Sequence, residues 1–554
     1  MGICKYQNNN FNNFLEKIPY ICYNIAILKR EDIPMVLTHP SRIGDIDRYA
    51  EQKLGISVMT LMERAGRAVA DAVRSYTKIG SRVSIFAGKG NNGGDGYAAA
   101  LYLIRDYDVT VYDVFSMGQR SAEGQYFLSE FMSNGGVIEP LDFSEKQITS
   151  ISSSSCVVDA VFGTGLTSDL PDIALKLSRL IATLDGVTKI AVDVPLGVNS
   201  SDGSINHSAV YRATATVVLG FMKTGLVSYP ALEYVGYLIF DNIGLQYTDF
   251  EKDFSFDDYR VDRSLAVSLV PERGENTNKG SFGKLLMITG SKAYRGAAFL
   301  SLEAALRFGV GYVTFVGEES LCDSLLSRFP EAIYKRTEDI SDITSASIDD
   351  LSLTSAKHSA VLAGCGSSVS DGLLLLLQRL LSEEGAPLVL DADAINALAS
   401  EGDEGRALIR NARRTVILTP HPLELSRLAG ISLAEIQERR YSVANEVARD
   451  LGCVLVLKGA ATIATDGKTT YINSSGSSAL AKAGSGDVLA GALASMVASG
   501  HDPLKAAALT VYLHGLAADA LAEELSEFGV TPSDLPREMA RQLAALIHGE
   551  LLNI

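Results

Sequence analysis

The stretch "GKGNNGGDGYAAAL" at residues 88–101 decides the fold of the first half of the chain. It follows the apolar run "RVSIFA" at 82–87 and leads into an alanine-rich segment of helical character. Glycine-rich turns between a strand and a helix leave backbone N–H groups free, and these usually cradle phosphate. This turn nevertheless carries a carboxylate, Asp95, where a bound phosphate would already be negative. Its simplest role is to cap the free N–H groups at the helix start, and a role at a ligand is the alternative.

The same combination of residues returns near the other end of the chain. In "AKAGSGDVLAGAL" at 481–493, Asp487 follows Gly484 and Gly486. Small residues free the N–H groups at a helix start, which favours the negative charge that develops on a transferring phosphoryl group. Asp487 can then accept a proton from an attacking hydroxyl, and we expect the helix start to keep its carboxylate ionised. In both loops, therefore, the backbone is predicted to handle phosphate and the carboxylate to have another task.

Composition and charge narrow the class of protein. The chain has 554 residues, of which 47% are hydrophobic and 21% charged, as expected for soluble α/β domains. A formal net charge of −17 argues against a nucleic-acid surface. Six cysteines without a CxxC pair indicate neither a zinc site nor a disulfide framework, and favour a reducing, cytoplasmic compartment. Since no apolar run reaches the roughly 18 residues needed to cross a bilayer, we expect no membrane partner.

Short apolar runs alternate with helical stretches in two series. We predict strands at 82–87, 108–115, 155–163, 188–195, 213–221, 235–244, 283–290, 311–317, 359–366, 386–394, 414–422, 453–462 and 469–473. Alternation of strands and helices implies parallel sheets covered on both faces. The acidic, aromatic stretch 245–262 is predicted to be a linker. The predicted organisation is a disordered extension at 1–34, whose composition differs from the rest, followed by α/β domains at 35–248 and 249–554.

Two further aspartates end predicted strands of the first series. Asp159 lies in "VVDAVFGTGL" and Asp193 in "VDVPLGVNSSDG". The carboxyl ends of parallel strands form the ligand crevice of an open sheet. Burying a carboxylate at the end of an apolar run costs free energy, so a ligand role is favoured for both aspartates, with helix capping as the alternative.

With the loop at 88–96, these motifs resemble the NAD(P)H-hydrate epimerase domain, which is Rossmann-like and three-layered. That family interconverts the R and S forms of NADH or NADPH hydrated at C6 of the nicotinamide ring. The resemblance implies that two loops and one strand end contact the substrate, through Asn91, Asn92, Gly93, Gly94, Asp95, Gly163, Thr164, Gly165, Leu166, Thr167, Ser168, Asp169 and Asp193.

The resemblance also implies a potassium site formed by Asn92, Asp159 and residue 196. The family usually reads Val-Asp-Ile-Pro-Ser-Gly here, whereas this chain has Leu196 in place of the serine. If the ligand is the backbone carbonyl, little changes. If a hydroxyl is required, the ion site is weakened.

In the second series, Gly-Ser-Gly-Asp before an alanine-rich helix is typical of ribokinase-like small-molecule kinases. Together with "DADAIN" at 391–396, "TPHPLE" at 419–424 and "LKGAAT" at 457–462, it resembles the ADP-dependent NAD(P)H-hydrate dehydratase. In that family a nucleotide phosphorylates the ring hydroxyl, and loss of phosphate restores NAD(P)H. The resemblance assigns Asp487 as base and substrate contact, Gly486 to the nucleotide, Lys458, Gly459, Ala460, Ala461 and Thr462 to its phosphates, and Ala297, Gly366 and His421 to the hydrate.

Other polar residues of this half are less specific. His421 is favoured as functional because it lies within "TPHPLE", against a structural alternative, whereas His514 and the remaining histidines have no motif context and are expected to be structural. Glu424 and Asp393 are candidates for organising magnesium or water, with a structural role as the alternative. Asn278 stands where the family often has His before Lys-Gly.

We therefore predict a bifunctional repair enzyme with a Rossmann-like first domain and a ribokinase-like second domain. The first domain is expected to epimerise hydrated NADH or NADPH, and the second to dehydrate the S form at the expense of ADP or ATP. The implied cofactors are K⁺ in the first domain and Mg²⁺ in the second, and the resemblance suggests a homo-oligomer. Two rivals remain: a ribokinase-like vitamin-precursor kinase, and a first domain that only binds nucleotides.

Overall fold

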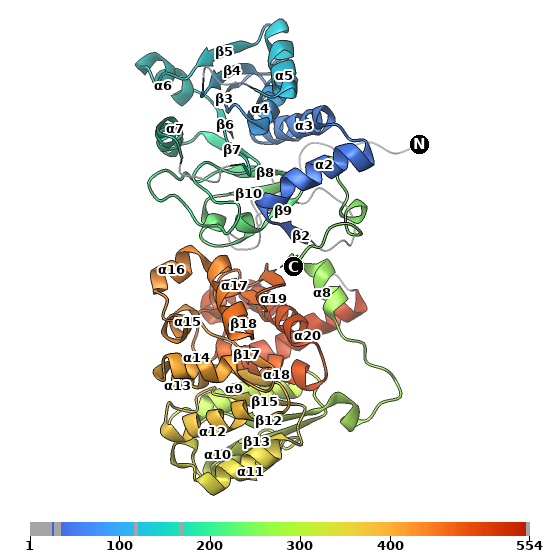
Figure 1. Cartoon of the computed structure of the whole chain (residues 1–554), viewed down its shortest axis with the longest axis vertical. Coiled ribbons are helices and arrows are strands. Elements are labelled where there is room, and N and C mark those ends of the chain that lie inside the picture. Colours follow the sequence, from blue (N-terminus) through green and yellow to red (C-terminus); the bar gives the residue numbers. More distant parts are fainter. Residues whose placement is uncertain (1–24, 27–34, 116–119, 166–169, 550–554) are drawn as a thin grey trace. The chain divides into compact units, whose positions relative to one another are not determined.

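The structure is a computed structural model that describes residues 25–26, 35–115, 120–165 and 170–549 (Figure 1). The chain divides into two compact units. The first unit comprises Asn24–Arg260 with Ser432–Val443, and the second comprises Val261–Ile431 with Ala444–Ile554. Each unit is an α/β structure built on parallel strands, as predicted.

The first unit contains an eight-stranded parallel sheet in the order β1-β10-β8-β7-β6-β3-β4-β5. The strand bounds are β1 Ile25–Ala26, β3 Arg82–Ala87, β4 Asp108–Asp113, β5 Val137–Pro140, β6 Cys156–Ala160, β7 Thr188–Val192, β8 Ala215–Leu219 and β10 Tyr237–Asp241. The central strands β3, β6, β7 and β8 are apolar and buried because helices cover both faces of the sheet.

Those helices form two separate cores, so the first unit has three layers. One core joins the sheet to α2 (Ile43–Leu54), α3 (Val58–Tyr76), α4 (Asn91–Leu103) and α5 (Ala122–Ser133). The other joins it to α6 (Glu145–Ser152) and α7 (Asp172–Ala182). The two cores share no residue, as expected for a sheet with two buried faces.

Most of the stretch predicted to be a linker, 245–262, instead belongs to the first unit, which extends to Arg260. Phe250 is fully buried and Phe256 is 8% exposed, and both pack in the core of that unit against Phe221. Its last residues form β11 (Asp258–Val261), which pairs with β2 (Met35–Thr38), and β2 pairs with β9 (Met222–Lys223). The boundary therefore falls after Arg260 rather than at 248, because buried aromatic rings tie the acidic stretch to this core.

The second unit contains strands in the order β14-β13-β12-β15-β16-β17-β18-β19-β20. The pairs from β14 to β18 are parallel, and β19 is antiparallel to both β18 and β20. The strand bounds are β12 Lys284–Ile288, β13 Tyr312–Gly317, β14 Ile333–Arg336, β15 Ala360–Ala363, β16 Leu388–Leu390, β17 Val416–Leu418, β18 Val454–Leu457, β19 Ile463–Thr465 and β20 Thr470–Asn473.

Helices of the second unit follow almost every strand. Their bounds are α8 Arg263–Leu269, α9 Arg295–Arg307, α10 Glu319–Leu326, α11 Ser345–Ser355, α12 Asp371–Ser382, α13 Asp393–Ser400, α14 Asp403–Arg410, α15 Pro422–Ala429, α17 Arg440–Leu451, α18 Ser485–Ala498, α19 Pro503–Gly529 and α20 Leu535–His548. The short helix α16 (Leu433–Glu438) and the first residues of α17, up to Val443, belong to the first unit. Helix α18 is buried along most of its length, because Ala and Gly let it pack closely against α9 and α19.

Within the predicted extension, only Ile25 and Ala26 are described, and they pair with β10. Disorder at 1–34 otherwise lies outside the described residues and stays a prediction. Among the helices that the structure describes, none is both long enough and apolar enough to cross a membrane.

Candidate active sites

Helix α4 begins directly after the glycine-rich turn of the first unit. Its N-cap is Gly90, and in the described part of the chain no side chain bonds to the N–H groups at its start. Asp95 is the fifth residue of the helix and does not cap it, so capping does not explain this carboxylate. Burial raises the pKa of Asp95 well above its ordinary value, and the nearby Asp193 and Asp47 raise it further.

The glycines of this turn allow close backbone packing. A Cβ atom on Gly88 would lie 2.0 Å from the carbonyl oxygen of Val161, and one on Gly93 would lie 1.9 Å from that of Gly88. Both distances are impossible contacts, so these glycines let the start of α4 approach the sheet. Gly90 and Gly165 have open space around them.

Asp193 follows β7 at the carboxyl end of the parallel sheet. Its φ is +65°, an uncommon value for a residue with a side chain, and such strain concentrates at functional sites. Oδ1 accepts hydrogen bonds from the buried ammonium of Lys223 and from the backbone N–H of Leu219 at 3.3 Å. A Cβ atom on Gly163 would lie 3.2 Å from Asp193 Oδ2 and 3.4 Å from Asn92 Oδ1. The structure thus brings together three residues that the sequence predicted at one site.

Asp159, predicted as a potassium ligand, is 1% exposed at the end of β6. Oδ2 accepts hydrogen bonds from the backbone N–H of Leu196 and from the Tyr211 hydroxyl, both at 2.8 Å, and Oδ1 accepts one from Val161 N–H at 3.2 Å. Burial raises its pKa to about 6, and these donors oppose the rise. Helix capping is therefore not its role.

The side chain of Leu196 packs in an apolar core and is 2% exposed. Of the two options that the sequence left open, a backbone ligand at this position is compatible with that packing, whereas a hydroxyl there would lie among apolar groups. Thr164 lies beside Gly163 and is half-buried. Leu166, Thr167, Ser168 and Asp169 lie outside the described residues.

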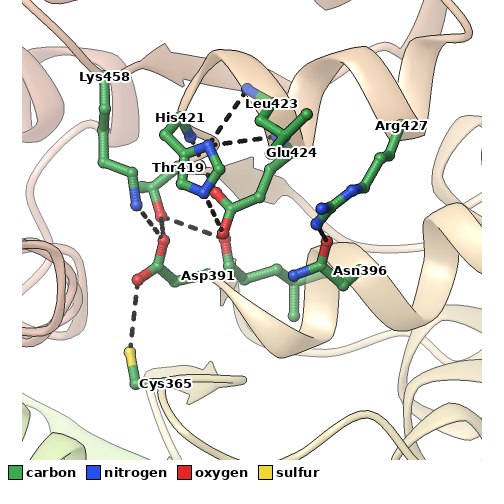
Figure 2. A network of polar contacts seen from close by, with 10 residues as sticks. Cys365, Asp391, Asn396, Thr419, His421, Leu423, Glu424, Arg427 and Lys458 are labelled. Atoms are coloured by element: carbon green, nitrogen blue, oxygen red, sulfur yellow. Dashed lines mark hydrogen bonds and ion pairs between the residues drawn. The ribbon is translucent and has the colours of Figure 1, made fainter. Parts of the chain in front are cut away.

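The second unit holds a buried ion pair that the sequence did not single out (Figure 2). Asp391 follows β16, is 1% exposed, and its Oδ1 accepts hydrogen bonds from Lys458 Nζ and the Thr419 hydroxyl, both at 2.7 Å. Its Oδ2 lies 3.7 Å from the Cys365 sulfur. The next residue, Ala392, has a φ of +48°, so this strand end is strained like that at Asp193.

Asp487 lies in the first turn of α18, whose N-cap, Gly484, has a φ of +104°. Burial raises the pKa of Asp487 to about 7, with Asp391 adding to the rise and Lys458 opposing it. The expectation that the helix start alone keeps Asp487 ionised is wrong, because burial outweighs the favourable helix end. A carboxyl with a pKa near 7 is, however, well suited to proton transfer at neutral pH.

Gly486 adjoins this ion pair, since a Cβ atom there would lie 3.3 Å from Lys458 Nζ. Lys458 begins a turn between β18 and β19 that includes Gly459, Ala460 and Ala461, and the Thr462 hydroxyl closes it by donating to the Gly459 carbonyl at 2.7 Å. The structure therefore places the predicted phosphate-binding turn beside the start of α18.

His421 is the N-cap of α15, and its Nδ1 accepts hydrogen bonds from the N–H groups of Leu423 and Glu424 at 3.2 and 3.3 Å (Figure 2). The Glu424 carboxylate accepts the N–H of His421 at 2.9 Å, which completes a capping box. Burial and Lys458 lower the pKa of His421. The structural alternative for His421 thus has direct support, while its ring remains half exposed.

Gly366 and Ala297, both predicted to contact the hydrate, face one another. A Cβ atom on Gly366 would lie 2.6 Å from that of Ala297. Asp393 accepts the Ser368 N–H at 2.9 Å, and burial raises its pKa.

Among the described residues, one group has ligand atoms close enough to hold a metal ion, namely Cys365, Asp391 and Asp487, whose atoms lie within 4.8 Å of one another. The Cys365 thiol has a pKa raised well above its ordinary value by burial and by both carboxylates, so it stays protonated. The two carboxylates suit Mg²⁺, which prefers oxygen ligands, and a thiol does not.

Sequence reasoning missed three buried groups. Asp391 has a visible signal, because it opens "DADAIN" directly after an apolar run. Lys223, in "GFMKTG", has none, since its partner Asp193 is distant in sequence. His514, assigned to structure, is 6% exposed and interacts with the backbone of Ser485, and its Nε2 has no partner among the described residues.

Fold and sites together define an α/β protein with two clusters of buried carboxyl groups, each near a glycine-rich helix start and the carboxyl ends of parallel strands. A family model described as NAD(P)H-hydrate dehydratase matches residues 285–541, and one described as YjeF-related protein N-terminus matches residues 58–225.

Curated relatives match nearly the whole chain. A bifunctional NAD(P)H-hydrate repair enzyme Nnr of Thermofilum pendens is 34% identical over 518 residues, covering 92% of this chain and 97% of the relative. The enzyme of the same name from Coxiella burnetii is 33% identical over 508 residues, covering 90% and 98%. A crystal structure of ADP/ATP-dependent NAD(P)H-hydrate dehydratase from Bacillus subtilis, co-crystallised with ATP and Mg²⁺, is 28% identical and covers 51% of this chain and 97% of its own, with a TM-score of 0.44. The chain belongs to the family of bifunctional NAD(P)H-hydrate repair enzymes.

Proposed function

We propose that this chain repairs hydrated NADH and NADPH in two steps. The first unit interconverts the R and S hydrates, and the second dehydrates the S hydrate at the expense of ADP or ATP. Family membership over nearly the whole chain supports both activities. The observation that carries the proposal is the start of α18, which has no side-chain cap and where Asp487 adjoins the Lys458–Asp391 pair.

In the second unit, Asp487 is the base. It accepts the proton of the C6 hydroxyl while the hydroxyl oxygen forms a bond to the terminal phosphorus of the nucleotide. The start of α18, which has no side-chain cap, is proposed to stabilise the transferring group, and Gly486 leaves room for it. Phosphate then leaves C6 with the bonding electron pair, and loss of a proton from C5 restores the C5–C6 double bond of the reduced ring.

The turn from Lys458 to Thr462 is proposed to line the nucleotide phosphates. When bound, Mg²⁺ would neutralise charge on those phosphates, and the carboxylate of Asp391 is suited to hold it, while Asp487 is kept as the base. Glu424 is already engaged in the cap of α15, and Asp393 accepts a backbone N–H, so both are proposed to organise the surrounding loops. Ala297, Gly366 and His421 remain the proposed contacts of the hydrate.

In the first unit, Asp193 is proposed to contact the hydrated ring, and the loop from Asn91 to Asp95 and that from Gly163 to Asp169 to surround the dinucleotide. K⁺ is proposed to bind Asn92, the carboxylate of Asp159 and the backbone carbonyl of Leu196. Asp159 already accepts three hydrogen bonds, so the ion would bind the lone pairs of the carboxylate that these bonds leave free. We also propose a homo-oligomer, which size-exclusion chromatography with light scattering would test.

The decisive experiment incubates the full chain with purified S or R hydrate and ADP or ATP, and follows the near-ultraviolet absorbance of the reduced ring together with free phosphate. Recovery of the reduced cofactor with release of phosphate supports repair. A stable phosphorylated product supports the rival vitamin-precursor kinase. Use of the S hydrate alone, with the R hydrate left unchanged, supports a first unit that only binds nucleotides.

A further inference from the structure

Lys223 is a buried lysine of the first unit that no motif accounts for. It ends β9, beside β2, and is 1% exposed. Burial of an ammonium is expensive unless it is paired, and its Nζ donates to Asp193 Oδ1 and, at 2.7 Å, to the carbonyl oxygen of Leu219. The partner lies at the strand end that we propose contacts the hydrated ring.

These contacts orient the Asp193 carboxylate. Oδ1 is occupied by Lys223 and by the N–H of Leu219, and the Asp193 N–H donates to the Val217 carbonyl at 2.8 Å. The residue is held at both its backbone and one carboxylate oxygen in the left-handed conformation. Such a conformation persists only where the surroundings determine it strongly. The other oxygen, Oδ2, is left to face Gly163.

A second buried polar group points to a ligand at this place. Asn92 is 8% exposed, and its Nδ2 has no hydrogen-bond partner among the described residues. Its Oδ1 and Asp193 Oδ2 flank the Cα of Gly163, where a side chain would fill the space between them. An unpaired buried amide is costly, and a polar ligand beside Asp193 would satisfy it.

Two further carboxyl groups surround the pair. Asp47 on α2 and Asp95 on α4 are half-buried, and both interact electrostatically with Asp193 and Lys223. Burial raises the pKa of both, and Lys223 opposes the rise. One ammonium cannot balance three ionised carboxylates, and its direct bond is to Asp193. The group therefore combines an ion-paired carboxylate with carboxyls that hold their protons more tightly.

We propose that Lys223 is a positioning residue of epimerisation, which holds Asp193 as the base with Oδ2 aimed at the C6 hydroxyl of the hydrate. This inference rests on the proposed function of the first unit. Asp193 takes the hydroxyl proton, the O–H electron pair forms the C6=O bond, and the C6–N1 bond breaks. Its electron pair passes to N1, which takes the proton that Asp193 accepted. Reclosure on the opposite face of the aldehyde carbon reverses these transfers and inverts C6.

The test compares Lys223→Met, Asp193→Asn and the double variant in the full chain, with epimerisation measured as conversion of R to S hydrate by chromatography. Lys223→Met is expected to lower kcat by about 10- to 100-fold, below the effect expected for loss of the base itself, with a smaller change in KM. In the Asp193→Asn background, Lys223→Met should have no further effect on kcat. Because both charges are then removed, the double variant should melt at a higher temperature than Lys223→Met yet stay as inactive as Asp193→Asn.

Lys189→Met is the matched control, since Lys189 is a half-buried lysine on β7 of the same sheet. It should leave kcat unchanged. Dehydration of S hydrate by each variant reports that the second unit is intact. The proposal is overturned if Lys223→Met keeps more than half of the wild-type kcat, or if the substitution lowers kcat equally in both backgrounds. Failure of the wild-type chain to convert R to S hydrate would instead overturn the proposed function.

Discussion

The starts of α4 and α18 are two versions of one sequence device. Both follow a glycine-rich turn, both begin at a glycine N-cap, and neither has a side-chain cap in the described structure. At α18 the aspartate lies in the first turn, and its pKa responds to Asp391 and Lys458 of neighbouring strand ends. At α4 the aspartate is Asp95, which lies one residue beyond the first turn. The carboxylate that forms an ion pair near this helix is that of Asp193, which follows β7. The comparison teaches that the same glycine-rich helix start can meet a different set of charges, because the partners of each aspartate come from strand ends elsewhere in the fold.

The largest expected effect tests the base at α18. Asp487→Asn keeps the shape of the side chain but removes the base, which costs on the order of 10² to 10⁴ in rate, or roughly 3 to 5.5 kcal/mol of barrier. Turnover of S hydrate should fall by that factor, while calorimetry should still detect nucleotide binding. With the pKa of Asp487 at about 7, the wild-type rate should rise as pH increases through 7. Retention of more than about a tenth of turnover would leave Asp487 without a catalytic role.

The second test fills the space beside each aspartate. Gly163→Ala places a methyl group 3.2 Å from Asp193 Oδ2 and 3.4 Å from Asn92 Oδ1, so epimerisation should fall by about tenfold or more through misplacement of the substrate. Gly44→Ala is the control, because Gly44 is exposed on α2 of the same unit and the nearest atom would lie 3.9 Å from the added one. Gly486→Ala is the counterpart at α18 and should weaken nucleotide binding without changing epimerisation. Equal effects of Gly163→Ala and Gly44→Ala would mean that the pocket is elsewhere.

The third test asks whether the residue at position 196 contributes to K⁺ binding or to packing of the apolar core. Leu196→Ser deletes a side chain that is 2% exposed, and large-to-small changes of this kind cost about 2–5 kcal/mol. We expect a lower melting temperature and no gain in K⁺ affinity of epimerisation. Leu196→Met, which conserves volume, should cost less than about 1.5 kcal/mol. Tighter K⁺ dependence in Leu196→Ser would show that the hydroxyl is a ligand after all.

The smallest expected effect is on the pH dependence of stability. The raised pKa of Asp487 means that the folded chain binds more protons than the unfolded chain between about pH 4 and pH 7. Its contribution to stability is therefore present at low pH and is lost as pH rises through 7. Asp487→Asn should thus raise the melting temperature more at pH 8 than at pH 5, as scanning calorimetry would measure. An equal shift at both values contradicts the raised pKa.

Most strands were predictable, because buried parallel strands appear in sequence as short apolar runs. The predicted strand 82–87 coincides with β3, and other predicted runs extend beyond their strands by a few residues, where Asp193 and Asp391 begin the site loops. The acidic stretch before Arg260 was misassigned, since acidic composition masked Phe250 and Phe256, whose burial depends on distant partners. The short strand β9 had no periodicity to detect.

Sequence by itself determined the two glycine-rich helix starts, the aspartates at strand ends and the family, because each depends on residues that are neighbours in the chain. Tertiary structure alone decided which charges meet. Lys223 reaches Asp193, and Lys458 reaches Asp391, only because the fold brings together residues at the ends of strands that are not neighbours in a sheet: β17 separates β16 from β18, and β9 pairs with β2 rather than with β7. The tertiary structure also decides which groups are desolvated, and burial is the main cause of the raised pKa of Asp487 and of Asp95. Local sequence carries no measure of burial, because the atoms that exclude water come from residues far along the chain.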